Sequence, residues 1–413
     1  MSKIINKIKE EWNSYSKNIK ITLIVLGILS GLFVIFGLQV LFGGLGYTGM
    51  DNVFAWAQWI IGDLGLVALG GGAFFTGFIL YIFRVDKLEP IINSAVLVGF
   101  LCYLFTFVFL LFDLGQPLRF WFGFAYPNWG PSLMPKSMLT EVFFCLTAYF
   151  MILFVEMIPI ALKHKVLDKY PVIHGIGHYM HKIMWIFAAA GTFLSFFHQG
   201  SLGGGAFGVL YAKPGWFRLH FFYMAIVAAT AGGTSFMAVV AWFAGKVMKK
   251  EVVPIETFSI LLRISGAMFV FYGAFRVYDL MTLIYTWVPT SGRTFTSLWG
   301  GYYGLWMLVL ELLALGGAII LLNMIWLKNN RLNEKVMFAG ALTGVFGIIV
   351  SKISVLMHGF STPNFPWKKF AVYHPTIQEW SVTFGAFAIM ALIYMWCAKY
   401  LPLFPHAEEK EDH

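Results

Sequence analysis

The sequence predicts an all-α, multi-pass integral membrane protein of about ten transmembrane helices. Of its 413 residues, 59% are hydrophobic and only 12% are charged, and the mean hydropathy is +0.75. This composition excludes an ordinary soluble protein and indicates a chain whose helices face lipid. Aromatic residues reach 18%, as expected of helices that face acyl chains and place indole rings at the headgroups.

The hydrophobic residues fall into ten runs separated by polar and Gly/Pro-rich breaks. Each run is long enough to form a helix that crosses the bilayer, which takes about 20 apolar residues. We expect a tail over residues 1–19, a transmembrane domain over 20–400 and a second tail over 401–413. The ten runs lie near 20–42, 55–83, 91–112, 137–162, 182–202, 216–245, 256–286, 300–327, 335–357 and 378–400.

The distribution of Lys and Arg predicts the orientation of these helices. The two tails and the even-numbered connections carry 19 of the 29 Lys and Arg residues, the other side carries 7, and the remaining 3 lie inside spans. Because positive charge is retained in the cytoplasm, both tails are expected there. The net charge of +9 then reflects orientation rather than nucleic-acid binding. The longer loops, near 112–136, 203–215, 287–299 and 358–377, would face the exterior, where they could receive a partner.

The three cysteines, Cys102, Cys145 and Cys397, are isolated within hydrophobic runs and form no CxxC spacing. No iron–sulfur cluster or structural zinc held by cysteine is therefore expected on this chain.

A short internal repeat is visible. The segments FLLFDL at 109–114 and FRVYDL at 275–280 share Phe, an aromatic residue and Asp-Leu at the outer ends of the third and seventh spans. Both spans run in the same direction, so the repeat would consist of two parallel four-helix units.

Ionisable residues inside the spans concentrate at one face. Charges in a bilayer are costly, so each one is a functional hypothesis. Glu311 is placed near mid-depth, and Glu156 and Arg263 toward the cytoplasm. The other nine of the twelve lie near the outer face: Asp63, Asp113, Glu141, His198, His220, Arg276, Asp279, Lys352 and His358.

Simpler roles remain open for some of these groups. Arg276 and Asp279 are i,i+3 neighbours that could form only a local ion pair, and headgroup water could solvate Asp113 and Glu141 at helix ends. The accumulation of acids, bases and histidines at one depth nevertheless favours a ligand site.

Two local segments sharpen this prediction. FDLGQPLRFW at 112–121 turns through Gly and Pro, which should return Arg119 and Trp121 to the membrane interface and keep Arg119 near Asp113. LSFFHQGSLGGG at 194–205 presents His198, Gln199 and Ser201, followed by glycines that permit close approach of a ligand. The GxxxxGK[ST] spacing of a phosphate loop is not present.

A quinone fits a cavity that combines these polar groups with abundant Phe, Trp and Met. Its two-electron chemistry requires a proton donor or acceptor at each carbonyl, and histidine and carboxylate side chains can serve as either. By position, Gln199, Ser201, Trp121 and His358 would contact the quinone. A proton path would use Glu311 and Glu156, with Arg263 and the hydroxyls of Thr230, Thr234 and Ser235 beside it. The outer-face groups Asp63, Arg276, Asp279 and Lys352 would complete that path.

Three segments resemble the NrfD family, the polysulfide reductase-type quinone-interacting membrane subunits, and within it a ten-helix branch. They are DLGQPLRFW at 113–121, SMLTEVFFCLTAYFMILFVEMIP at 137–159 and HKIMWIFAAAGTFLSFFHQGSLG at 181–203. The resemblance implies two four-helix bundles plus two further helices in a prokaryotic cytoplasmic membrane. It places Asp113, Arg119, Glu141 and His198 at or beside the quinone site, with Glu141, His198 and Asp113 carrying the proton chemistry.

The resemblance also implies cofactors and partners. Menaquinone or ubiquinone would bind as a substrate near the periplasmic face, without haem or an iron–sulfur cluster on this chain. Electrons would pass to or from a periplasmic four-cluster-type iron–sulfur subunit, in a complex that includes a catalytic or cytochrome subunit.

Two other functions remain open from the sequence. A membrane cytochrome b would use His198, His220 and His358 as haem ligands. A secondary transporter would bind its substrate between repeats near the midplane, deeper than most of the charges here.

Overall fold

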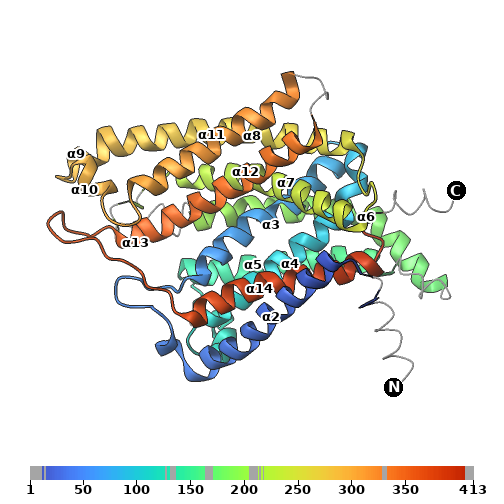
Figure 1. The fold of residues 1–413 in the computed structure, drawn as a ribbon, viewed down its shortest axis with the longest axis horizontal. Helices are drawn as coiled ribbons and strands as arrows, with labels where there is room; N and C mark the ends of the chain where they lie inside the picture. Colours follow the sequence, from blue (N-terminus) through green and yellow to red (C-terminus); the bar gives the residue numbers. More distant parts are fainter. Residues whose placement is uncertain are drawn as a thin grey trace.

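The computed structural model describes residues 12, 13, 15–125, 128–130, 136–162, 171–203, 213, 215, 216, 218–327 and 333–404. Most of both predicted tails, and Gly204 and Gly205 of the glycine-rich segment, lie outside the described residues. Long helices run along one common direction (Figure 1). They are α2 (Lys17–Gly43), α3 (Trp59–Tyr81), α4 (Glu89–Asp113), α5 (Met138–Leu162), α6 (Pro171–Gly200), α7 (Phe221–Met248), α8 (Ile255–Thr282), α11 (Leu305–Leu327), α12 (Glu334–Ile353) and α14 (Ile377–Tyr400).

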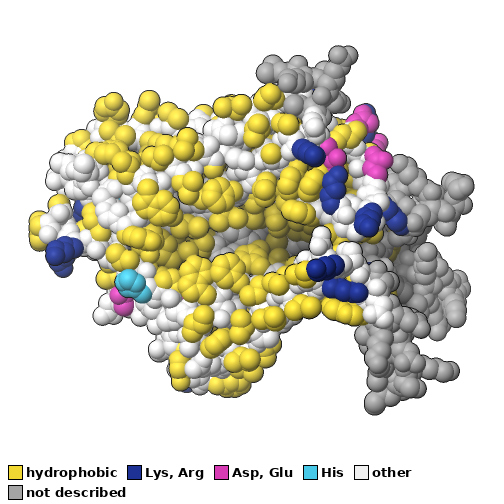
Figure 2. Space-filling view, in the orientation of Figure 1, with side chains coloured by type: hydrophobic (Ala, Val, Ile, Leu, Met, Phe, Trp, Pro, Cys, Tyr) yellow, Lys and Arg dark blue, Asp and Glu magenta, His cyan; other side chains and the backbone are white. Residues whose placement is uncertain are grey.

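Nine helical segments of the described part of the chain are long and apolar enough to cross a membrane. Hydrophobic side chains cover the middle of the molecule, whereas charged ones gather toward its two ends (Figure 2). The protein is therefore a multi-pass, all-α membrane protein, as predicted. The predicted number of ten spans is one too many by this measure. The additional long helix is α6, whose apolar stretch is shortened by Lys182 near one end and by His198 and Gln199 at the other.

Eight of the long helices form two four-helix bundles, as predicted. In the first bundle α3 packs on α4 and α6, and α5 packs on α4 and α6. In the second bundle α7 packs on α8 and α12, and α11 packs on α8 and α12. The contact pattern is the same when α3, α4, α5 and α6 are matched with α7, α8, α11 and α12. The remaining two helices, α2 and α14, pack on each other.

The two bundles meet where α3 crosses α7. A Cβ atom built on Gly72 would lie 2.3 Å from the carbonyl oxygen of Gly233, so the two backbones touch at this point. Small residues permit such close approach, which favours helix association in lipid because dispersion contacts rather than hydrophobic burial drive it.

The helix ends define two ends of the molecule. α2 begins where α14 ends, since Lys399 Nζ lies 6.0 Å from the ring of Tyr15; we call this the terminal end and the opposite one the distal end. Several short elements continue or connect the long helices: η1 (Leu45–Tyr47), η2 (Asp86–Leu88), η3 (Pro117–Phe124), η8 (Leu283–Trp287), α9 (Val288–Thr290), α10 (Phe295–Trp299), η9 (Ser354–His358) and α13 (Gly359–Ser361).

The second helix of the second bundle and its last helix both change to π-helix at the distal end. α8 continues into η8, and α12 continues into η9, where His358 is the last residue. Short π-helical segments are common at functional sites because they widen the helix and redirect its side chains.

Candidate functional site

Glu141 and Ser201 are hydrogen-bonded at the distal end of the first bundle, and Ser201 lies three residues after His198. Glu141 lies in the first turn of α5, and Ser201 directly follows α6. The Ser201 hydroxyl lies 3.0 Å from Glu141 Oε1, to which it donates, and 3.2 Å from the carbonyl oxygen of His198. Cys145 Sγ, one turn along α5, donates to the same Oε1 at 3.0 Å.

Two buried atoms of this cluster have no hydrogen-bond partner within the described part of the chain. They are Glu141 Oε2 and His198 Nδ1, and the His198 side chain is only 1% exposed. A buried polar atom without a partner costs about 1–3 kcal/mol, so such pairs point to a ligand or water that completes them.

Aromatic rings form a wall beside His198. Its ring packs edge-on against Tyr149, with centroids 5.5 Å apart. Tyr149 stacks on Tyr103 at 4.9 Å with an interplanar angle of 13°. Rings offer stacking surface and hydroxyls offer hydrogen bonds, the two kinds of contact that a planar ligand with polar ends requires.

Asp113 ends α4 and is fixed by the first residue of α3. Trp59 Nε1 donates to Asp113 Oδ1 at 2.7 Å. Asp63, one turn further along α3, is 6% exposed and interacts electrostatically with Asp113. The two acids predicted from the sequence are thus neighbours.

Arg119 and Trp121 do not join this pair of acids. Both are exposed on η3, and the Trp121 side chain is 57% exposed. The ion pairs of the described residues do not include one between Asp113 and Arg119. No salt bridge of the described residues therefore joins Arg119 to Asp113, although η3 packs on both α4 and α5.

Gln199 is bound within the first bundle and borders the second. Its Nε2 donates to the carbonyl oxygen of Val67 on α3 at 2.8 Å. Gln199 also lines a cavity of about 50 Å³ between the bundles, together with Arg276, Lys352 and Tyr272. The cavity is large enough to hold water, and its polar lining supplies partners from both bundles.

The second bundle contains a dense ionic cluster. Arg276 Nε and Nη2 each donate to one oxygen of Glu311 at 2.9 Å, and Arg276 Nη1 donates to Asp279. Arg218 Nη1 donates to both oxygens of Asp279 at 2.8 and 2.6 Å. His220 Nε2 lies 2.5 Å from Asp279 Oδ1. The i,i+3 ion pair expected from the sequence exists, but as part of this larger network.

The charges of the ionic cluster compensate one another. Both carboxylates have 0% exposed side chains, and two guanidinium groups balance them. Removing one member of such a buried network is costly, although Arg218 Nε is buried without a hydrogen-bond partner among the described residues. Arg218, three residues before α7, is a partner of Asp279 that the sequence reasoning did not single out.

His358 belongs to the second bundle rather than to the Glu141 cluster. It ends η9, and its ring is parallel to that of Trp299 with centroids 6.4 Å apart. His358 thus lies on the other bundle from Gln199 and Ser201, although Gln199 lines the same cavity as Val355 of η9.

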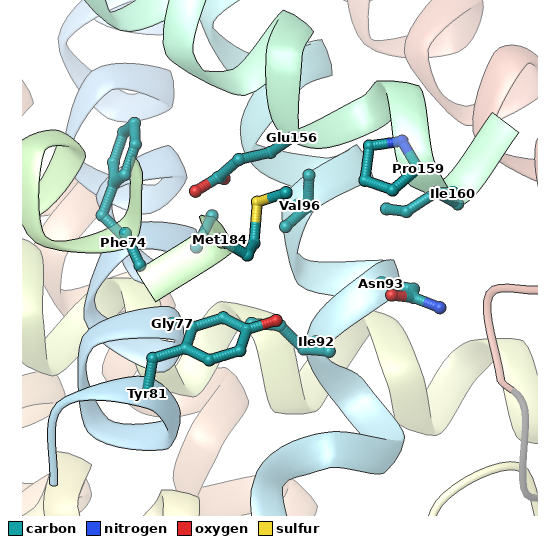
Figure 3. Close-up of a pocket in the computed structure, with 12 residues that line it drawn as sticks. Phe74, Gly77, Tyr81, Ile92, Asn93, Val96, Glu156, Pro159, Ile160 and Met184 are labelled. Carbon is teal, nitrogen blue, oxygen red and sulfur yellow. The ribbon is translucent and has the colours of Figure 1, made fainter. Parts of the chain in front are cut away.

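Glu156 lies apart from all these groups. It follows Glu141 by 15 residues on α5, about 22 Å along the helix. The side chain is 6% exposed. Its carboxylate points into a small cavity of about 20 Å³, toward Met184 and Phe74, with Tyr81 and Asn93 on the other side (Figure 3). One water molecule fits a cavity of this size.

The other groups of the predicted path have local partners. Thr230 and Thr234 bond to carbonyl oxygens one turn earlier on α7, and Ser235 Oγ lies 2.7 Å from Ser265 Oγ. Arg263 lies 5.2 Å from the ring of Trp326. These contacts stabilise helix packing and do not form a continuous chain of hydroxyls.

Glu379, at the start of α14, is a buried carboxylate that the sequence reasoning did not single out. It accepts from Gly49 N at 2.5 Å, Gln58 N at 2.9 Å and the Tyr373 hydroxyl at 2.7 Å. Burial and the Glu379 carboxylate raise the pKa of the Tyr373 phenol well above its usual value. The T-x-x-E sequence from Thr376 to Glu379 predicts the start of a helix. It does not predict that Glu379 accepts hydrogen bonds from the segment before α3.

The fold and these buried groups define a multi-pass membrane protein with a polar site inside a four-helix bundle. Among the described residues, no group of three or more His, Cys, Asp or Glu side chains is arranged to hold a metal ion. Residues 46–364 match the family described as "Polysulphide reductase, NrfD". The chain therefore belongs to the NrfD family, as its resemblance predicted.

Relatives support the same assignment. The chain is 36% identical over 394 residues to "Menaquinone reductase, integral membrane subunit" of Nitratidesulfovibrio vulgaris, which covers 92% of this chain and 91% of that protein. It is 22% identical to a selenate reductase subunit of Mesobacillus selenatarsenatis, covering 90% of each chain. It is 23% identical to "Probable Ni/Fe-hydrogenase 2 b-type cytochrome subunit" of Escherichia coli, covering 91% of this chain and 90% of that one.

Proposed function

We propose that this chain is the quinone-reactive membrane subunit of a respiratory oxidoreductase complex, with menaquinone as the favoured substrate. The observation that carries this proposal is the Glu141–Ser201–His198 cluster, where two buried atoms lack partners beside a wall of aromatic rings. Membership in the NrfD family and the relative named menaquinone reductase subunit support it.

The cluster suits the chemistry of a quinone carbonyl. Reduction of a quinone to a quinol takes up two electrons and two protons, and the reverse reaction releases them. His198 Nδ1 and Glu141 Oε2 are the groups that would exchange protons with the two quinone oxygens or with water beside them. Asp113 and Asp63, fixed at the neighbouring end of α3, would hold further protons near this site.

The electrons would come from or go to an iron–sulfur subunit docked at the distal end. Exposed side chains there include Leu118 and Trp121 on η3 and Trp367 in the loop before α14, which are 88%, 57% and 77% exposed. Aromatic side chains are enriched in protein interfaces. The excess of Lys and Arg on the terminal side supports a cytoplasmic location for both termini, which would place the distal end in the periplasm.

Protons would reach the site from the terminal side. Glu156, in its own small cavity, would be an entry group. The cavity between the bundles, with Gln199, Arg276 and Lys352 in its lining, would carry protons near the quinone. Asp279 and Glu311 are held by arginines, so they would keep Arg276 in place and not exchange protons themselves.

Replacement of the two central groups tests the site. Glu141→Gln and His198→Gln keep size and hydrogen bonding but remove the exchangeable charge. Quinone-dependent turnover of the intact complex should fall about 10²- to 10⁴-fold, as for loss of general acid–base catalysis. Glu334→Gln, at an exposed residue that pairs with Lys246 at the terminal end, is the matched control and should retain full activity. Undiminished activity of both site variants would refute the assignment.

The alternative role for His198 is that of a haem ligand, as in a b-type cytochrome subunit. Of the three candidate ligands, His220 lies 2.5 Å from Asp279, while His198 and His358 belong to different bundles. The proposal therefore expects no Soret absorption from the purified subunit. A haem spectrum that disappears in His198→Gln would favour the cytochrome role instead.

A further inference from the structure

A large apolar groove opens on the side of the molecule at its terminal end. Figure 2 shows it as a hollow with hydrophobic walls between α14 and α7. Its volume is about 1010 Å³. α2, α4, α7 and α14 all contribute to it, and its apolar lining includes Leu23, Leu101, Val240, Phe243, Met390 and Trp396.

The groove spans one leaflet of a bilayer. Along α14 its lining extends from Phe387 to Tyr400, about 20 Å at the rise of an α-helix. A bilayer is roughly 40–45 Å thick with its headgroups, so half of it is about the same length. A transmembrane helix of a partner needs about 30 Å of contact to cross the hydrocarbon, and the groove is too short to pack such a helix along its full length.

Charged character in the groove is found at the end that reaches the membrane surface, whereas the hydroxyl of Tyr394, further along the lining, is paired with Ser94. Tyr15, Lys399 and Tyr400 line that end, and Lys399 Nζ lies 6.0 Å from the Tyr15 ring and 5.3 Å from the Tyr400 ring. Lys17 and Lys20 flank the lining residue Ile19, and Lys246 and Lys249 flank Val247 and Met248. Lys and Arg side chains are seen on both sides of the hollow at this end (Figure 2).

We propose that this groove binds one anionic phospholipid of the leaflet at the terminal end. Its acyl chains would lie against the apolar walls, and its phosphate would meet Lys399 and Lys20. The apolar walls, which extend over one leaflet, match the acyl chains of such a lipid. The positive charge at the membrane surface matches its phosphate. Basic pockets between transmembrane helices are known to attract anionic lipid headgroups.

Native mass spectrometry of the purified protein tests this proposal, with phosphatidylglycerol and phosphatidylcholine as probes. One phosphatidylglycerol should bind per chain more tightly than phosphatidylcholine. Lys20→Glu and Lys399→Glu should each weaken phosphatidylglycerol binding about fivefold or more. Ala391→Trp, which fills the groove from a half-buried lining residue, should abolish it. Lys369→Glu, at the distal end, is the matched control and should bind like the wild type.

A second measurement reports on the groove directly. Phosphatidylglycerol with brominated acyl chains should quench tryptophan fluorescence, and the part due to Trp396 should be lost in Trp396→Phe and reduced in Lys399→Glu. Equal binding of phosphatidylcholine, wild-type binding by both lysine variants, or quenching that Trp396→Phe leaves unchanged would overturn the proposal. A quinone that co-purifies and is displaced by Ala391→Trp would assign the groove to a different ligand.

Discussion

Asp113 and Asp279 occupy equivalent places in the two four-helix bundles. Each lies at the distal end of the second helix of its bundle, against a side chain from the start of the first helix. Trp59 Nε1 lies 2.7 Å from Asp113, and His220 Nε2 lies 2.5 Å from Asp279. The difference is in the charges around them. Two arginines neutralise the acids of the second bundle, whereas no ion pair between described residues involves Asp113. The buried acids of the second bundle are thus charge-compensated, whereas Asp113 is held by a neutral indole donor.

The ionic cluster should be essential for stability. Arg276→Leu leaves Glu311 and Asp279 buried with a charge uncompensated, so the free energy of unfolding should fall by about 3–5 kcal/mol. Thermal unfolding in detergent measures this. The double variant Arg276→Met/Glu311→Met removes both charges and should be less destabilised than Arg276→Leu. A single variant as stable as the wild type would mean that the cluster is solvated rather than buried.

The contact between the bundles should tolerate no added methyl group. Gly72→Ala would place a Cβ atom 2.3 Å from the backbone of Gly233, so α3 and α7 would have to separate, at a cost of about 1–3 kcal/mol. Gly65→Ala, on the same helix with nothing within 4 Å of its Cβ position, is the control and should be neutral or slightly stabilising. Similar unfolding temperatures for both variants would contradict the close crossing.

Much of this architecture is readable from the sequence, because lipid imposes apolar runs of fixed length and positive charge orients them. The shared Phe and Asp-Leu residues at 109–114 and 275–280 predicted the repeat that the helix contacts reproduce. Glu141 and Ser201, which the sequence assigned to the same face, are hydrogen-bonded, and Ser201 also donates to the backbone carbonyl of His198.

The remainder depends on contacts that no local pattern encodes. Glu379 and Gly49 are 330 residues apart in the chain, and Arg218 reaches Asp279 from a loop 61 residues earlier. Arg119 lies on η3 without a salt bridge to Asp113, and a Gly-Pro turn alone does not determine where such a side chain points.

Glu156→Gln should separate electron transfer from proton transfer. If Glu156 admits protons from the terminal side, the variant in proteoliposomes should retain quinone turnover within about an order of magnitude when protons are available at the distal end. It should lose the membrane potential generated during turnover. The control is Glu256→Gln, at an exposed residue paired with Lys87. A normal membrane potential in Glu156→Gln would exclude this carboxyl from the path.

The Tyr373–Glu379 hydrogen bond should stabilise the folded protein at neutral pH and lose this effect at alkaline pH. Tyr373→Phe should lower the free energy of unfolding by about 1.5–3 kcal/mol, because the lost bond is to a charged group. The pKa of Tyr373 is raised in the folded protein, so the wild-type advantage should be constant below about pH 10, the ordinary value for tyrosine. It should shrink as the pH rises above that value. An advantage that grows at alkaline pH would contradict the contact.

Photolabelling of the intact complex with an azido-quinone, followed by peptide mapping, tests the central claim most directly. The account predicts label at the distal end of the first bundle, on peptides that contain Glu141, Tyr149 and His198, and its reduction by excess unlabelled menaquinone. The account would be contradicted if the label that menaquinone displaces were confined to the second bundle, around Arg276 or His358.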